Sequence, residues 1–187
     1  FPRDPTIRYG LSQYYIAVGV VSKASESLLA AARLSPEYYF PLGLWQHRIN
    51  QRERAAVSFE QASTYYASVV AREPENAPAR LRWASCQTNL GNPEESLRIL
   101  AEGAQLDKST DYKPAMAHSC VYIFDAMRGA KVVDHRARLA WLHQALGHVP
   151  NFPPALTRLA AYAVGQADEE VTEMLEVLLA TGADVAF

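Results

Sequence analysis

Apolar residues in this 187-residue chain recur at intervals of three and four, and no useful stretch alternates with a period of two. Steps of three and four return to the same face of an α-helix, whereas a step of two follows one face of a strand. The segment from Ala55 shows the helical step plainly, with Phe59, Ala62, Tyr66 and Val69 following at 4, 3, 4 and 3 residues. The pattern therefore predicts an all-α chain.

Glycine, proline and asparagine divide this pattern into short segments. Breaks are expected near 19–22, 35–36, 50–52, 73–76, 91–93, 107–111, 129–134, 147–154 and 165–167. They leave about ten helices of roughly 11–16 residues each, joined by short loops that make neighbouring helices antiparallel. The last helix carries the stripe Val171, Met174, Leu175, Leu178 and Leu179 after a capping Asp168. Five hairpins follow, and because none buries its apolar face alone, they are expected to stack.

The hairpins share a succession of small and large residues. Small residues stand on the first helix (Ser12, Gly43, Ala84) and on the second (Ala24, Ala55, Ser96), and large ones follow four residues later (Leu28, Phe59, Leu100). Small residues let two helices approach closely, and large ones fill the space against the next hairpin. Between the two helices, Gly19, Asn50 and Gly91 suit a left-handed helix stop.

This succession resembles the tetratricopeptide repeat, whose pattern runs from an aromatic residue through Leu-Gly, Tyr and Ala-x3-Phe to Pro. The resemblance implies a right-handed solenoid of about five antiparallel helical hairpins forming one domain over 1–187. The repeats are expected at about 5–36, 37–74, 75–108, 112–150 and 153–182. Two departures are plain. The second helix of the second hairpin extends two turns to Arg72, and the helix from about Tyr112 to Arg128 lacks the Leu-Gly pair.

Composition excludes several other classes. The chain is 49% hydrophobic with a formal charge of −2, and its cations are 14 Arg against 4 Lys. A nearly neutral chain lacks the basic surface that nucleic-acid binding requires. No apolar run approaches the roughly 20 residues of a membrane span. We therefore expect that the chain does not bind nucleic acid and does not span a membrane.

No motif for catalysis, cofactor or metal binding stands out. The histidines form no HExxH, and His143 and His148 lie about 140° apart on a helix. The triplet Gly129-Ala130-Lys131 lacks the rest of a phosphate loop. Acid pairs such as Glu94-Glu95 open helices, where carboxylates complement the helix dipole. We expect no enzyme, no cofactor and no metal.

Cys86 and Cys120, the two cysteines, lie in predicted helices among small and apolar residues. They are expected to be buried free thiols, with a disulfide as the alternative. The compartment is left open, with the cytoplasm slightly favoured over the periplasm or another exported location. Phe1, where an initiator methionine would stand, leads us to expect a mature product or a fragment.

The resemblance implies that the first helix of each hairpin lines a concave groove that holds a partner peptide. The groove positions carried over by spacing are Tyr9, Gln13, Phe40, Leu44, His47, Arg48, Arg82, Ser85, Asn89, Phe124 and Asp125. Tyr9, Phe40 and Phe124 have an alternative role as core residues. One subfamily clamps a terminal carboxylate with Lys, Asn and Arg. Tyr9 and Gln13 occupy its first two positions here, so no such clamp is expected.

The favoured hypothesis is a non-catalytic scaffold that binds a partner peptide or protein, within a longer protein or as a subunit of a larger complex. Two alternatives remain. One is a regulatory or substrate-recruiting module of a larger enzyme. The other is a self-associating structural subunit.

Overall fold

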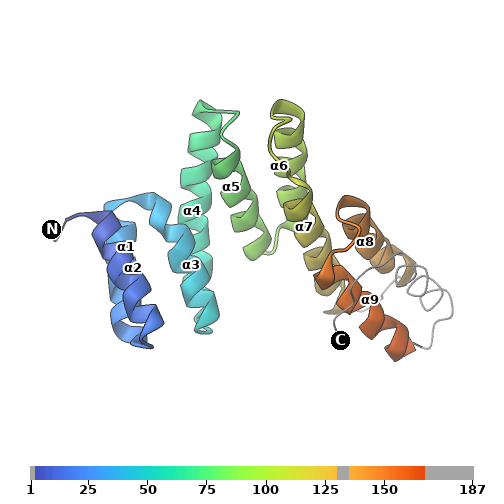
Figure 1. Cartoon of the computed structure of the whole chain (residues 1–187), viewed down its shortest axis with the longest axis horizontal. Helices are drawn as coiled ribbons and strands as arrows, with labels where there is room; N and C mark the ends of the chain where they lie inside the picture. Colours follow the sequence, from blue (N-terminus) through green and yellow to red (C-terminus); the bar gives the residue numbers. More distant parts are fainter. Residues whose placement is uncertain (1–2, 130–134, 167–187) are drawn as a thin grey trace. The chain divides into compact units, whose positions relative to one another are not determined.

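A computed structural model describes residues 3–129 and 135–166 of the chain. Nine α-helices and two short 3-10 helices lie in these ranges (Figure 1). The α-helices are α1 (Pro5–Ala17), α2 (Val21–Leu34), α3 (Tyr39–Arg48), α4 (Arg52–Arg72), α5 (Ala77–Asn89), α6 (Pro93–Leu106), α7 (Lys113–Ala126), α8 (His135–His148) and α9 (Pro153–Gln166). The 3-10 helices are η1 (Pro36–Tyr38) and η2 (Met127–Gly129). No strand occurs in the described ranges, which confirms the all-α class.

The helix boundaries follow the predicted breaks closely. The long second helix of the second hairpin is confirmed, because α4 runs without interruption to Arg72. The helix expected from Tyr112 to Arg128 is shorter and ends at Ala126, where a 3-10 turn continues to Gly129. The tenth helix, predicted on the stripe from Val171 to Leu179, lies outside the described residues.

The three hairpin turns of the first half have one geometry. Gly19, Asn50 and Gly91 all have positive φ, at 75°, 62° and 83°. In each turn the next residue's N–H donates to the carbonyl five residues back, as from Val20 to Tyr15 at 2.8 Å. Gln51 and Asn92 donate to Gln46 and Gln87 in the same way, at 2.8 and 2.9 Å. This is the Schellman helix stop, and the predicted left-handed positions are confirmed.

The chain divides into two compact units, Phe1–Glu95 and Ser96–Phe187. Unit 1 holds α1 to α5, and unit 2 holds α7 to α9 with most of α6. The boundary falls inside the expected repeat 75–108, so the predicted single domain over 1–187 and its repeat boundaries stay predictions.

Unit 1 has two apolar clusters that join successive hairpins. In the first, α2 packs on α3 through Ala24, Leu28 and Ala32 against Leu42 and Trp45. In the second, α4 packs on α5, with residues that include Phe59, Ala62, Tyr66, Ala79 and Cys86. The hairpins of unit 1 therefore stack through their second helices, as the repeat pattern requires.

Close helix approach depends on the small residues. A Cβ at Gly43 would lie 2.8 Å from the Phe59 ring, so only glycine lets α3 and α4 pack at this distance. In unit 2, Ser96 and Ser119 meet through their hydroxyls at 3.0 Å between α6 and α7. The core of unit 2 gathers Cys120, Phe124, Leu142, Leu156 and Leu159 among others.

Candidate functional site

A basin of about 410 Å³ opens on unit 1. Its walls come from α1, η1, α3, α4 and α5, so residues far apart in the sequence meet there. The lining residues are Tyr9, Glu37, Tyr38, Phe40, Pro41, Leu44, Tyr66 and Arg82. The basin thus combines aromatic and aliphatic walls with one cation and one carboxylate.

Ring packing fixes the aromatic walls of the basin. The rings of Tyr9 and Tyr38 lie 5.1 Å apart, which ties α1 to the turn before α3. Phe40 meets Tyr66 edge to face at 6.3 Å and Phe59 at 6.2 Å. Such aromatic pairs favour tilted or edge-on geometry and hold each other in place. The walls are therefore built before any ligand arrives.

Leu44 stands one helical turn beyond Phe40 on α3 and is 44% exposed. A leucine side chain held in solvent at the edge of an aromatic basin is apolar area that a ligand can cover. Leu44 is therefore an exposed apolar residue of the lining that a partner can cover, and its replacement should disturb the fold little.

Tyr66 and Arg82 form the polar part of the basin. The Tyr66 hydroxyl donates to the Glu37 carbonyl at 3.1 Å and accepts from Arg82 Nη1 at 3.3 Å. The Arg82 guanidinium also lies 5.7 Å from the centre of the Tyr66 ring. Burial raises the pKa of Tyr66 above its ordinary value, and the nearby Arg82 charge opposes that rise. The phenol therefore stays protonated and keeps its bond to Glu37.

Four groove residues predicted from spacing, Tyr9, Phe40, Leu44 and Arg82, come together in this basin. Gln13, His47 and Arg48 are exposed on α1 and α3 and do not belong to the basin lining. His47 and Arg48 follow Leu44 by three and four residues, so they continue its face of α3.

Ser85 and Asn89 are half-buried on α5. The Asn89 amide donates to the Ser85 carbonyl at 2.8 Å, within its own helix. The Asn89 amide and the Ser85 carbonyl are therefore already joined by a hydrogen bond within α5.

Sequence reasoning missed four lining residues: Glu37, Tyr38, Pro41 and Tyr66. Tyr38 and Glu37 lie in the 3-10 turn that the sequence pattern marks only as a break at Pro36. Tyr66 belongs to the two added turns of α4, whose apolar step placed it in the predicted stripe. The added turns were the available signal, because they extend α4 alongside α5.

The two predicted groove residues of unit 2, Phe124 and Asp125, both make contacts within the unit. Phe124 is 3% exposed and lies under the guanidinium of Arg138, 4.1 Å from the ring centre. Arg138 Nε also donates to the Phe124 carbonyl at 3.0 Å. This burial favours the core role that the sequence left as the alternative for Phe124.

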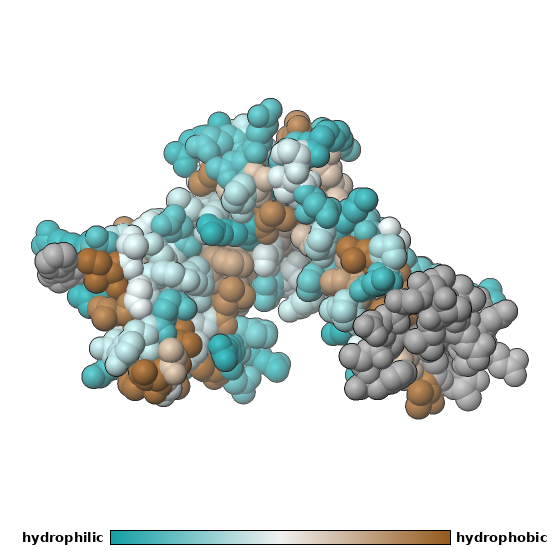
Figure 2. All heavy atoms as spheres, in the orientation of Figure 1, coloured by the Kyte–Doolittle hydropathy of each residue, from teal (hydrophilic) through white to brown (hydrophobic). Residues whose placement is uncertain are grey.

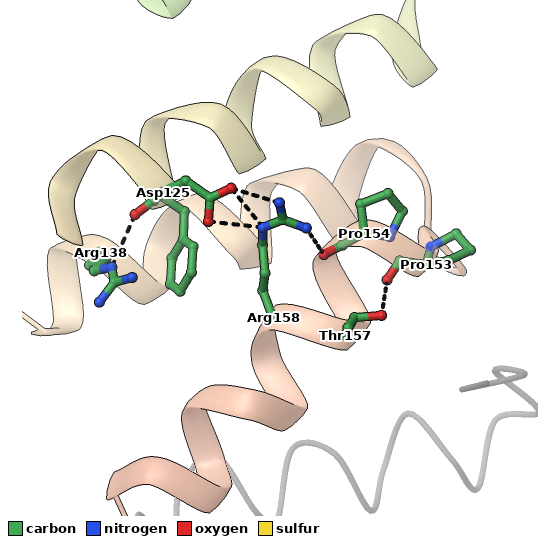
Figure 3. A network of polar contacts seen from close by, with 7 residues as sticks. Asp125, Arg138, Pro153, Pro154, Thr157 and Arg158 are labelled. Atoms are coloured by element: carbon green, nitrogen blue, oxygen red, sulfur yellow. Dashed lines mark hydrogen bonds and ion pairs between the residues drawn. The ribbon is translucent and has the colours of Figure 1, made fainter. Parts of the chain in front are cut away.

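Asp125 is exposed but occupied by Arg158 from α9. Arg158 Nε lies 2.9 and 2.8 Å from the two carboxylate oxygens, and Nη2 lies 2.7 Å from Oδ2 (Figure 3). Arg158 Nη1 also donates to the Pro154 carbonyl at 3.0 Å. This forked contact holds α7 to α9 at the edge of a cavity of about 220 Å³. Its first role is therefore within unit 2.

The described residues show no built site for a metal: no group of three His, Cys, Asp or Glu side chains is close enough to share an ion. Cys86 and Cys120 are buried free thiols, as expected, and they lie in different units. None of the described helices is long and apolar enough to cross a bilayer.

A family model of the tetratricopeptide repeat matches residues 54–118. The predicted family resemblance is confirmed. The tetratricopeptide-repeat match spans α5 and α6 with most of α4, and it covers the long helix that supplies Tyr66. A search of curated protein sequences found no match.

Solved tetratricopeptide-repeat structures share the fold. MamA from residue 41 to its end, from Desulfovibrio magneticus RS-1, is 14% identical with a TM-score of 0.53, covering 94% of this chain and 93% of that one. YrrB, described as a TPR protein with an unusual peptide-binding site, is 18% identical with a TM-score of 0.50, covering 83% and 74%. Identities this low establish the helical-repeat fold alone.

Proposed function

We propose that this chain is a non-catalytic interaction module whose unit 1 basin receives an apolar side chain of a partner peptide. The observation that carries the proposal is the basin itself, formed where the first helices of three successive hairpins converge. Tetratricopeptide repeats use this face of their hairpins for partners, and the predicted residues Tyr9, Phe40 and Arg82 lie there.

The lining chemistry supports a peptide ligand. Ligand sites combine apolar and aromatic walls with a few polar groups that fix orientation, and Tyr and Arg often dominate interface energy. The basin volume of about 410 Å³ lies in the range of small-ligand pockets, which suits a large apolar side chain with its neighbouring backbone rather than a folded surface. Arg82 is exposed and carries five donors, one of which reaches Tyr66. The other donors suit a carbonyl or carboxylate of the peptide beside its apolar residue.

The YrrB structure supports the same class of ligand, since its description names a peptide-binding site on a protein of this fold. The scaffold's wider setting stays a prediction. A module of a larger enzyme and a self-associating subunit remain its alternatives.

A selection experiment identifies the peptide class directly. The immobilised chain is offered a random peptide library, and enriched sequences are measured against wild type and single variants. We expect enriched peptides to share a large apolar residue. Arg82→Ala should weaken their binding about tenfold, because it removes the basin's donors. Arg48→Ala should weaken it less, because Arg48 lies beyond the lining on the same helix face as Leu44.

Circular dichroism provides the control, since both arginines are exposed and helicity should be unchanged. Peptides that bind Arg82→Ala as tightly as wild type would remove the basin from the proposal.

A further inference from the structure

The first helix of the chain exposes an apolar stripe on the face opposite the basin. Ile7, Leu11, Tyr14 and Val18 are 37%, 40%, 61% and 51% exposed. Ile7, Leu11 and Tyr14 lie on α1 and Val18 is its C-cap residue, and their spacing of four, three and four residues places them within an arc of about 60° around the helix. Tyr9, which lines the basin, lies on the far side of the same helix. Figure 2 shows hydrophobic residues at the surface over the α1–α2 end.

The shared hairpin turn lets this stripe be compared with the next two hairpins. Counted back from the left-handed residues Gly19, Asn50 and Gly91, the stripe stands at positions 1, 5, 8 and 12. The same positions carry Ile49, Trp45, Leu42 and Tyr38 in the second hairpin, and Leu90, Cys86, Trp83 and Ala79 in the third. All eight of these residues are buried or half-buried.

In the second and third hairpins, the second helix of the preceding hairpin packs over these equivalent positions. Leu42 and Trp45 pack against Ala24 and Leu28 of α2, the second helix of the hairpin before them. Ala79 and Cys86 likewise pack against the cluster that Phe59 of α4 belongs to. In both covering helices a large residue follows a small one after four positions, as from Ala24 to Leu28 and from Ala55 to Phe59. The face that α1 leaves open is therefore built for a helix of this kind.

We propose that the stripe on α1 docks an amphipathic helix of a partner protein that presents the small–large–small face of α2. Continuity with the α2–α3 and α4–α5 packing carries this choice, because the partner helix would repeat an interface already made twice in unit 1. The stripe resembles the equivalent residues of α3 more than those of α5. Leu11 stands at the position of Leu42, and Tyr14 stands at the position of Trp45. This surface is distinct from the basin and does not depend on it.

The probe is a fluorescein-labelled synthetic peptide with the sequence of residues 20–35, which is α2 with one flanking residue on each side. Anisotropy should show saturable binding to the intact chain. Tyr14→Glu should weaken that binding at least tenfold, because it places a charge in the apolar contact. Val57→Glu is the matched control, since Val57 is 58% exposed on α4, outside the stripe, and its replacement should leave binding unchanged. A peptide carrying Leu28→Glu should not bind.

Absence of saturable binding, or binding equal in Tyr14→Glu and wild type, would overturn the proposal.

Sedimentation velocity tests whether a second copy of this chain occupies the stripe. We expect a monomer, and a dimer that Tyr14→Glu dissociates would assign the stripe to self-association instead. A third possibility is that another segment of the same polypeptide covers the stripe. Thiol labelling of a Tyr14→Cys variant, expressed within its natural polypeptide, tests it. We expect the new thiol to react rapidly, and a slow reaction in the isolated monomer would overturn the assignment to a partner protein.

Discussion

At Gly43 the ring of Phe59 fills the space that a Cβ would need, with two ring carbons 2.8 Å from the ideal Cβ position. The contact joins α3 to α4, so one absent methyl group sets the spacing of the second hairpin. Phe59 is itself 1% exposed and touches Phe40 of the basin wall. A shift of this ring would therefore reach the candidate site.

We expect Gly43→Ala to lower the free energy of unfolding by about 1–3 kcal/mol, because overpacking a closed contact forces the ring to move. Gly10→Ala is the matched control. Gly10 lies in α1 with no atom within 4 Å of its ideal Cβ, so alanine should raise the free energy of unfolding by up to about 1 kcal/mol. Urea titration followed by circular dichroism measures both, and equal effects of one sign would contradict the packing argument.

The two thiols are held in the protonated form by burial, which raises the pKa of Cys86 to about 12 and of Cys120 to about 11. Thiolate is the reactive form, so neither should react with a thiol reagent near pH 8 while the chain is folded. Both should react at once in concentrated guanidinium chloride. Stoichiometric labelling of the folded chain would show that the thiols are open to solvent.

The same pKa shifts predict how stability depends on pH. The folded-state pKa values lie above the ordinary thiol value near 9, so the unfolded chain loses these protons first as pH rises. The contribution to stability is present below about pH 9 and declines above it. The urea midpoint should fall in that range, and less steeply in a Cys86→Ala variant.

At the scale of the element, the left-handed helix stops show how local sequence determines the hairpins. Asn50 adopts the same left-handed backbone conformation as Gly19 and Gly91, at φ 62°, although it has a side chain and they do not. Asparagine tolerates this region better than other residues with a Cβ, but glycine enters it without strain.

Asn50→Gly should therefore stabilise the chain slightly, by a few tenths of a kcal/mol or more, and Gly91→Ala should destabilise it by about 1–2 kcal/mol. No atom crowds the ideal Cβ of Gly91, so the expected loss comes from the backbone alone. Thermal unfolding measures the pair. A Gly91→Ala variant as stable as wild type would show that this backbone conformation is not needed.

Helices and turns that depend on residues close in the sequence could be predicted from the sequence. Contacts between residues far apart in the sequence could not. The full length of α4 follows from an unbroken apolar step, and the helix stops follow from Gly and Asn at fixed positions. The forked contact of Arg158 with Asp125 joins residues 33 apart, and no local pattern marks it. Tyr38 lines the basin from a 3-10 turn, where its ring packs against Tyr9 of a distant helix.

At the scale of the whole molecule, the predicted single domain has a direct test. The chain divides into two compact units, yet α6 runs unbroken from Pro93 to Leu106 across their boundary. In repeat proteins, cooperativity comes from coupling between neighbouring repeats. A continuous helix across the boundary favours such coupling.

We expect one unfolding transition, shifted both by Leu28→Ala in unit 1 and by Leu142→Ala in unit 2. Each residue is at most 1% exposed, so each substitution should cost about 2–5 kcal/mol. Hydrogen exchange and circular dichroism across a urea series resolve the transitions. Two separate transitions, each sensitive to one substitution, would contradict the single domain.

If a partner peptide binds in the unit 1 basin, a charge at Leu44 should weaken its binding. Leu44 and Val57 are both exposed apolar residues of unit 1, but only Leu44 lines the basin. The measurement is the dissociation constant of a library-selected peptide for wild type, Leu44→Glu and Val57→Glu. We expect this dissociation constant to rise about tenfold or more for Leu44→Glu, because a carboxylate would lie against the apolar contact, and to be unchanged for Val57→Glu. Equal dissociation constants for all three would contradict it.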